Sequence, residues 1–317
     1  MVSVDGCFII DKPAGLTSHD VVARVRKTIR ERRVGHTGTL DPFATGVLVV
    51  LVGRATRLAQ FLSGADKEYE AVIRLGFATD TGDFTGTRVG NFAAETQKAQ
   101  SLRREEIETA LAALRGEIEQ TPPMYSAKKI AGRKLYELAR RGEEVERKPV
   151  RVVINEFEIM MGNHELLKRN DDGTCDLTVR VACSAGTYIR VLAEDFGKQL
   201  GVGAHVAQLR RTRAGQFKIG CAITLERLNE LAQSESLEQV LISLDATLSS
   251  LPALQLGVDA VRRIGQGIDL QIEEANGSLW KNGQTVRLRN EDGQLIAVGI
   301  YDSERGTVHP QVVIVNA

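Results

Sequence analysis

The chain has 317 residues, more than one compact core usually holds, so we expect a large domain followed by a small one. The hydrophobic content of 43% is ordinary for a soluble globular protein, and no stretch approaches the roughly 20 apolar residues of a membrane span. The four cysteines form no C-x-x-C pair, the five histidines lack metal-ligand spacing, and the N-terminus does not resemble a signal peptide. We therefore expect a cytoplasmic protein.

The formal net charge is zero, but the charges are segregated along the sequence. Residues 21–40 carry six Lys or Arg against one Glu, residues 121–151 carry nine against four, and residues 204–218 carry four against none. Residues 226–274 reverse the balance, with nine acids against three arginines. The basic blocks could bind a polyanion if they share one face, whereas each block alone is equally consistent with a solvated helix face.

The first expected elements are a short buried strand at Cys7–Ile10 and an amphipathic helix. The break at Asp11–Gly15 separates them, and Ser18 is a suitable N-cap for the helix. Opposite its basic face, the helix has an apolar stripe of Val21, Val22, Val25 and Ile29.

A glycine-rich loop from Arg33 to Gly46 follows and leads directly into the apolar run Val47–Val52. That run predicts a buried strand, which puts the carboxylate of Asp41 at the edge of the core. Pro42 favours an extended backbone at Asp41, and the glycines allow a second backbone or a ligand to approach closely. Asp41 is therefore either a structural cap, the commoner role of Asp in a turn, or a nucleophile.

The rest of the first domain mixes strands and helices. Residues 67–76 alternate in polarity and predict a strand whose inward face includes Tyr69. The Pro-led basic segment at about 120–149 is expected to form an arm over a binding surface, with a helix from about Lys134 to Arg141. The other expected elements are helices at 54–62, 102–114, 189–200 and 225–231, strands at 150–159 and 177–182, and an extended basic segment at 204–217.

We place the domain boundary at Leu251-Pro252, where an acidic stretch ends. The first domain then comprises residues 1–250 and the second comprises residues 251–317. The second domain should be rich in β-structure, with a short helix at 258–264 and strands at 295–300 and 312–315.

The chain supplies companions for a catalytic Asp41. Arg190 lies in a second Gly-Thr-Tyr turn, and a guanidinium beside Asp41 would hold the carboxylate ionised, as a nucleophile requires. Tyr69 and Tyr188 are core residues or ring-stacking residues. The sequence contains no Walker loop, dinucleotide fingerprint, zinc signature or G-x-S-x-G elbow, so an enzyme of this sequence would work without a nucleotide or metal cofactor.

Six segments of the sequence resemble the motifs of a known family. DKPAGLTSHD at 11–20 and the loop at 35–46 closely resemble the first two motifs of the TruB family of bacterial tRNA pseudouridine synthases. The resemblance continues in family order over about the first 220 residues, with segments 67–69, 124–127, 186–190 and 203–211. The C-terminal module, with Trp280 to Gln284, resembles the PUA-type RNA-binding domain of bacterial members.

The resemblance implies a fold and a reaction. The expected fold is α+β, with a central mixed, largely antiparallel sheet flanked by helices and a small β-rich PUA-like C-terminal domain. The implied reaction converts uridine at position 55 in the T loop of tRNA to pseudouridine. Uracil leaves C1′, turns and rejoins through C5, so no cofactor is expected. The expected partner is the T arm of tRNA, and the expected state is a monomer.

The resemblance also implies roles for individual residues. The expected catalytic residues are three: Asp41 matches the catalytic aspartate, Tyr69 the tyrosine that stacks on the flipped base and is expected to shuttle a proton, and Arg190 the arginine that pairs with the aspartate. Tyr188 and Leu209 match positions that line the uracil pocket, and His36 matches a histidine that contacts RNA. In one departure, Gly82 stands where many members carry a carboxylate, which affects the contacts expected of that loop. The basic residues expected to contact RNA are Lys12, Lys129, Arg210 and Arg211.

Two other functions fit the residues less fully. A non-catalytic tRNA-binding protein or folding chaperone would use the same basic blocks and C-terminal module, but it would have little need of an aspartate facing an arginine. A nucleotide-binding enzyme could use the Gly35–Gly46 loop to hold an anion, but the loop lacks the Lys-Ser/Thr ending of a phosphate loop.

Overall fold

The computed structural model describes residues 4–126, 128–130, 132–135, 138, 141–143, 145–160, 166–272 and 280–314. The elements up to Thr247 are β1 Gly6–Lys12, α1 Ser18–Ile29, β2 Val34–His36, β3 Thr45–Val52, η1 Gly53–Leu58, α2 Ala59–Leu62, β4 Lys67–Leu75, β5 Ala78–Thr79, β6 Arg88–Val89, α3 Phe92–Ala99, α4 Arg104–Ala113, β7 Gly116–Gln120, β8 Lys129–Ile130, β9 Arg133–Lys134, β10 Val150–Ile159, β11 Lys168–Arg169, β12 Cys175–Cys183, α6 Ile189–Leu200, β13 Ala204–Ala214, β14 Phe217–Lys218, η2 Ile219–Cys221, α7 Leu225–Gln233, η3 Leu237–Gln239 and α8 Leu244–Thr247. The remaining elements are β15 Ala253–Gln255, α9 Val258–Gly265, β16 Leu270–Gln271, β17 Thr285–Arg289, β18 Leu295–Asp302 and β19 Thr307–Val313.

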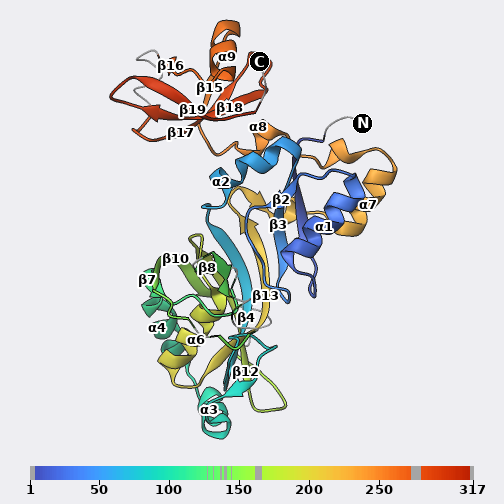
Figure 1. Ribbon diagram of the computed structural model, residues 1–317. Coiled ribbons are helices and arrows are strands. Elements are labelled where there is room, and N and C mark those ends of the chain that lie inside the picture. The colour runs from blue at the N-terminus through green and yellow to red at the C-terminus, as the bar shows by residue number, and fades with distance from the viewer. Residues whose placement is uncertain are drawn as a thin grey trace.

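A mixed sheet runs through the centre of the molecule in the order β1-β3-β13-β4-β12-β10-β7 (Figure 1). Its neighbouring strands are antiparallel apart from β3 and β13, which are parallel at Thr45 and Gly46. This arrangement confirms the expected α+β fold with a mixed, largely antiparallel sheet.

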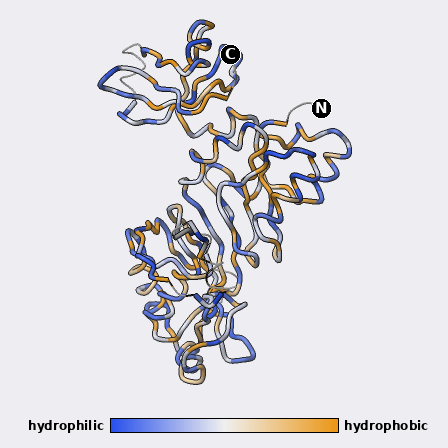
Figure 2. The backbone as a smooth tube through the Cα atoms, viewed as in Figure 1, coloured by the Kyte–Doolittle hydropathy of each residue, from blue (hydrophilic) through white to orange (hydrophobic). Residues whose placement is uncertain are grey.

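The strands β1 and β3 are buried on both faces, which explains their unbroken apolar sequence. One face packs against α1 and α7, and the other packs against η1, α8 and the C-terminal strands β18 and β19. Figure 2 shows this region as strongly hydrophobic. Alternate side chains divide between the two cores, with Phe8, Ile10, Leu48, Val50 and Val52 in the first and Cys7, Ile9, Val47, Val49 and Leu51 in the second.

The strands β4, β10 and β12 alternate instead, because only one of their faces is covered. The inward residues of β4, Tyr69 among them, pack with α4 and α6, as the alternating sequence predicts. The outward face carries cross-strand ion pairs such as Arg74–Asp176, with Nε and Oδ1 2.7 Å apart. Arg180 on the same face pairs with Glu156 and Glu158.

Residues from Ala253 onward form a second, five-stranded sheet at one end of the molecule (Figure 1). Its strands β18 and β19 contribute Leu295, Val298 and Val312 to the core that also contains β1 and β3. Arg287 adds a polar link, because its Nη1 donates to Asp245 Oδ2 at 2.7 Å and its Nε donates to the Leu251 carbonyl at 3.0 Å. The second sheet is therefore packed against the first part of the chain rather than tethered by a linker.

Some local predictions were wrong or incomplete. Thr17, not Ser18, caps α1, because the Thr17 hydroxyl accepts a hydrogen bond from the Asp20 amide and Asp20 bonds back to Thr17. The sequence did not predict α3 or β7, which have few buried side chains. The helix expected at Lys134 to Arg141 falls largely outside the described residues, and Lys134 itself lies in β9.

The register of the central strands places Gly46, Arg211 and Tyr69 side by side on β3, β13 and β4. Gly46 has a φ of +101°, and a Cβ there would lie 2.2 Å from the Arg211 carbonyl oxygen. The parallel contact of β3 and β13 thus requires glycine at this position. It also fixes the Asp41 loop, which enters β3 here, about two strand spacings or ~10 Å from Tyr69.

We expect Gly46→Ala to destabilise the protein by more than about 3 kcal/mol, because it adds main-chain overlap with Arg211 to the strain of a positive φ. Gly116→Ala is the matched control, since Gly116 has a φ of +82° but no atom lies within 4 Å of the position its new methyl group would occupy. Gly116→Ala should lower the free energy of unfolding by only about 1–2 kcal/mol. Urea unfolding measures both values, and equal losses would contradict the role assigned to the contact between Gly46 and Arg211.

Candidate active site

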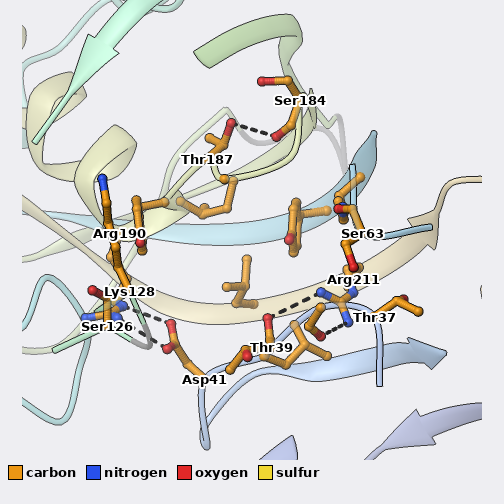
Figure 3. A pocket seen from close by; sticks show the side chains of 18 residues that line it. Thr37, Thr39, Asp41, Ser63, Ser126, Lys128, Ser184, Thr187, Arg190 and Arg211 are labelled. Carbon is orange, nitrogen blue, oxygen red and sulfur yellow. Dashed lines mark hydrogen bonds and ion pairs between the residues drawn. The ribbon is translucent and has the colours of Figure 1, made fainter. Parts of the chain in front are cut away.

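A pocket of about 230 Å³ opens beside the Asp41 loop. Its walls come from five segments that are distant in sequence: the loop, the start of β4, the segment before β8, the turn before α6, and β13 (Figure 3). The described lining residues are Thr37, Gly38, Thr39, Leu40, Asp41, Ser63, Lys67, Tyr69, Ser126, Lys128, Ser184, Gly186, Thr187, Tyr188, Ile189, Arg190, Leu209 and Arg211.

Asp41 and Arg190 form a bidentate ion pair on the pocket wall (Figure 3). Arg190 Nε donates to Asp41 Oδ2 at 2.9 Å, and Arg190 Nη2 donates to Asp41 Oδ1 at 3.2 Å. The Arg190 side chain is only 5% exposed, whereas that of Asp41 is 33% exposed. The arginine is therefore an internal anchor, and the carboxylate is the partner presented to the pocket.

The rest of the Arg190 guanidinium is also held. Its Nη1 donates to the Thr81 carbonyl at 2.7 Å, and its Nη2 donates to the Tyr125 carbonyl at 2.7 Å. The buried carboxylate of Asp83 lies 3.8 Å from Arg190 Nε and accepts hydrogen bonds from the Thr85 amide and from the hydroxyls of Thr81 and Thr85. This network fixes the guanidinium plane, and with it the orientation of Asp41.

Sequence reasoning missed Asp83 and placed the relevant carboxylate one residue away. Gly82 has a φ of +72°, and a Cβ there would lie 2.5 Å from Glu194 Oε1 and 3.1 Å from Arg190 Cβ. A side chain at 82 therefore does not fit this turn, and the carboxylate that faces Arg190 comes from the next residue. The turn-rich sequence Thr79–Gly86 was the available signal, but its spacing does not show which acid points inward.

The segment from Lys12 to Ser18 holds the Asp41 loop in place through hydrogen bonds. Lys12 Nζ donates to the carbonyls of Pro13, Leu16 and Pro42 at 2.9, 2.5 and 3.1 Å, and the Gly15 amide donates to the Pro42 carbonyl at 2.8 Å. Ser18 Oγ accepts from the Leu40 amide at 2.9 Å. The prediction that Lys12 contacts RNA is wrong, because its side chain is fully buried on these carbonyls and burial lowers its pKa to about 8.

Arg211 also supports the loop. It is almost completely buried, and its guanidinium donates to the carbonyls of Val47, Gly38 and Thr39 at 2.7, 3.0 and 3.4 Å. Arg211 is thus not on the outer surface as expected, but its side chain lines the pocket, so its contact with RNA stays a prediction. Arg210 is partly exposed and paired with Asp11, with Nη2 2.7 Å from Oδ2. The side chain of Lys129 lies outside the described residues.

The two predicted tyrosines and Leu209 line the pocket together. Tyr69 is buried, and burial raises the pKa of its phenol above the ordinary value, so the ring is a neutral wall beside Asp41. Burial likewise raises the pKa of Tyr188. Gln120 clamps the Tyr188 backbone, accepting from its amide at 2.9 Å and donating to its carbonyl at 3.3 Å.

His36 is not among the residues that line the pocket, and its expected contact with RNA near the flipped nucleotide stays a prediction. Its ring meets that of His19 edge to face, with centroids 5.5 Å apart. Burial, together with the charges of His19 and Arg211, lowers the His36 pKa to about 4. Its buried Nδ1 has no hydrogen-bond partner among the described residues.

Lys67 is a pocket residue that sequence reasoning did not single out. Its Nζ donates to the Ser63 carbonyl at 2.7 Å and to the Ala65 carbonyl, and burial lowers its pKa to about 8. It precedes Tyr69 by two residues on the inward face of β4, so the same alternation that indicated Tyr69 would have indicated Lys67.

The described residues offer neither a membrane-spanning helix nor a cluster of metal ligands. None of the helices there is both long and apolar enough to cross a membrane. No cluster of three or more His, Cys, Asp or Glu side chains within the described ranges could hold a metal ion.

Comparison with known proteins shows which family the chain belongs to. Residues 26–189 match the family model described as the N-terminal domain of TruB family pseudouridylate synthases, and residues 190–249 match the C-terminal domain of tRNA pseudouridylate synthase B. The chain is 43% identical over 316 residues to a tRNA pseudouridine synthase B of Bacillus thuringiensis (strain Al Hakam), covering 99% of this chain and 98% of the relative. The chain belongs to the TruB family of pseudouridylate synthases.

Other members and solved structures agree with this assignment to the TruB family. The chain is 42% identical over 309 residues to a tRNA pseudouridine synthase B of Geobacter sulfurreducens, covering 95% of this chain and 96% of the relative. A crystal structure of a Cbf5-Nop10-Gar1 complex contains a chain similar to it, with a TM-score of 0.73, 27% identity, and coverage of 98% of this chain and 85% of that one. A chain in an H/ACA RNP bound to a substrate RNA containing 2′-deoxyuridine gives a TM-score of 0.71 at 25% identity, with coverage of 98% and 85%.

The low pKa of His36 predicts a pH dependence of stability. In the unfolded chain His36 would take up a proton near pH 6.5, but in the folded protein it does so only near pH 4. Its contribution to stability is therefore present above pH 6.5 and lost as the pH falls toward 4. We expect the free energy of unfolding to fall less between pH 7 and pH 5 for His36→Gln than for the wild type, as measured by urea unfolding at each pH. Parallel pH dependences would show that His36 is not the buried neutral group described.

Proposed function

We propose that this TruB-family enzyme isomerises uridine 55 in the T loop of tRNA to pseudouridine. The observation that carries the proposal is the Asp41 carboxylate, held by Arg190 on the wall of a pocket that also contains Tyr69, Tyr188 and Leu209. The C1′–N1 bond breaks, the uracil turns, and a C1′–C5 bond forms as the proton on C5 is released and N1 gains one. Relatives similar over nearly the full chain are named tRNA pseudouridine synthase B, which supports this substrate.

The ion pair suits Asp41 for this chemistry. Arg190 occupies one lone-pair position on each carboxylate oxygen, which leaves another position on each oxygen for the substrate. Attack on C1′, addition to C6 and assisted cleavage of the glycosidic bond all require such a charged, oriented carboxylate. The position and orientation of Asp41 suit each of these three routes equally.

The target uridine must leave the base stack to reach Asp41. Tyr69 offers a neutral ring in the pocket for the extruded base, which is worth about 1–3 kcal/mol by stacking. That contribution is comparable to the cost of extrusion, so phosphate contacts must supply the binding energy. We expect Lys128, which lines the pocket, and the basic segment at about 120–149 to make such contacts.

The rest of the proposal concerns the whole chain. We assign residues 1–250 to the catalytic domain and 251–317 to a PUA-like RNA-binding domain, in keeping with the separate sheet that begins at Ala253. The RNA element recognised is the T arm, the active form is a monomer, and the site of action is the cytoplasm, where tRNA is processed.

The two alternative functions account for fewer contacts. A folding chaperone has no use for a buried arginine that orients a partly exposed aspartate. An anion-binding loop should offer free amides to a phosphate, yet here the Leu40 amide is taken by Ser18, and Asp41 adds a negative charge. The Asp41–Arg190 pair therefore favours catalysis over both.

We expect Asp41→Asn to reduce pseudouridine formation at least about 1000-fold, because the amide cannot act as a nucleophile. The measurement is tritium release or chemical mapping of pseudouridine in an unmodified tRNA transcript at saturating enzyme. Asp80→Asn is the control, since Asp80 lies in the nearby turn and is exposed outside the pocket. Retained turnover in Asp41→Asn would refute the assignment of Asp41, and an inactive wild type would refute the proposed reaction.

We expect Lys129→Glu to weaken tRNA binding and to reduce the slope of log affinity against log salt by about 1, because the arm would lose a phosphate contact. Arg151→Glu is the control, since Arg151 lies on the sheet face among Glu117 and Glu119. An unchanged salt slope for Lys129→Glu would count against the arm as an RNA contact.

A further inference from the structure

An exposed phenylalanine lies beside the Asp41–Arg190 pair. Phe84 is 54% exposed, the largest value for an aromatic side chain among the described residues. It follows Asp83, whose carboxylate is 3.8 Å from Arg190, and its amide donates to the Val206 carbonyl at 3.0 Å. The backbone that carries this ring is therefore fixed by the same network that orients Asp41.

The ring of Phe84 has one aromatic neighbour among the described residues. It meets the ring of Phe43 edge to face, with centroids 5.6 Å apart and an interplanar angle of 86°. Phe43 packs against the central core and is two residues from Asp41. One edge-to-face contact with a supported ring leaves a large part of Phe84 open to solvent, just outside the residues that line the pocket.

A second exposed ring is tied to the same arginine. Tyr125 is 43% exposed, and its carbonyl accepts from Arg190 Nη2 at 2.7 Å. Phe84 follows Asp83, whose carboxylate faces Arg190, and Tyr125 itself accepts from Arg190 through its carbonyl. Neither ring lines the pocket. Exposed rings at the rim of a polar site, on backbone that is otherwise well bonded, indicate a surface for a planar partner.

The substrate creates such a partner. When the target uridine leaves the stack, each neighbouring base loses one stacking face. An aromatic side chain can replace that contact regardless of base identity, because every base has a π-face. A ring outside the pocket is suited to a nucleotide next to the extruded one, whereas Tyr69, which lines the pocket, is suited to the extruded base itself.

We propose that Phe84 stacks on the nucleobase adjacent to the target uridine and so stabilises the extruded state, with Tyr125 as a second ring at the same rim. The proposal rests on the proposed function, since it assumes an RNA whose target base is turned out. It assigns the Thr79–Gly86 turn a direct contact with substrate in addition to its support of Arg190.

The test uses a T-arm hairpin RNA with the natural sequence and two versions with an abasic residue, one on the 5′ side and one on the 3′ side of the target. Affinity and single-turnover rate are measured for wild type, Phe84→Tyr, Phe84→Leu and Phe84→Ala. Phe84→Leu retains an apolar contact with Phe43 but has no π-face, so it separates stacking from packing. Val89→Ala is the surface control, because Val89 is also exposed and lies on β6 after the same turn.

On natural RNA we expect Phe84→Tyr and Val89→Ala to bind like the wild type, and Phe84→Leu and Phe84→Ala to bind about 5- to 100-fold more weakly. One of the two abasic RNAs should bind the wild type more weakly than the natural RNA does, by the same factor. Phe84→Leu and Phe84→Ala should bind that abasic RNA no more weakly than they bind the natural RNA. Phe84→Leu equal to wild type, or a variant defect that persists on both abasic RNAs, would overturn the proposal. Wild type that forms no pseudouridine would instead overturn the proposed function.

Discussion

The site depends on one buried guanidinium. Arg190 begins the first turn of α6, and its charge is compensated by Asp41 from a loop 149 residues earlier and by Asp83 from a third segment. A buried arginine without these partners would cost several kcal/mol, so the fold cannot place α6 without also placing the two acidic loops. The geometry of the Asp41–Arg190 pair is in this sense a condition of folding rather than an addition to it. Exposure then differentiates the two acids, because the side chain of Asp83 is only 7% exposed and its Oδ1 accepts three internal hydrogen bonds, while Asp41 lines the pocket.

The Asp41 loop is held mainly through its backbone. Three side chains that sequence reasoning would assign to the surface or to a helix cap, those of Lys12, Ser18 and Arg211, instead bond to the main chain between Gly38 and Pro42. Because peptide carbonyls and amides are present whatever the side chains are, such an arrangement fixes the path of the loop and leaves its side chains free for chemistry. Gly46 completes the frame by letting β13 approach the start of β3. The proposed role of Asp41 needs this preorganisation, since a misplacement of about 1 Å can cost about 100-fold in rate.

The sequence predicted the elements that bury apolar side chains in a regular pattern. The continuous run of β3, the alternation of β4 and the stripe of α1 each follow from the faces that are covered. It missed α3 because only Thr96 and Ala99 of that helix are buried, which leaves no apolar period to find. The roles of Asp41, Tyr69 and Arg190 came from the family resemblance, and spacing alone left Asp41 ambiguous. The errors at Lys12 and Arg211 have a common cause: buried Lys and Arg are rare, so their atoms were expected in solvent.

The charges of the residues that line the pocket have a consequence for binding. Among the described residues that line the pocket, Lys67, Lys128, Arg190 and Arg211 carry positive charge and Asp41 alone carries negative charge, although the protein as a whole is formally neutral. Most of this charge is bonded to carbonyl groups, which are dipoles and do not cancel it at a distance. A recess walled by protein focuses such a field toward its opening. The acidic residues needed for overall neutrality lie elsewhere, for example as ion pairs on the open face of the sheet. The charge of the pocket lining thus favours an anionic partner at its opening, and Arg211 contributes to that charge while it also holds the loop of Asp41.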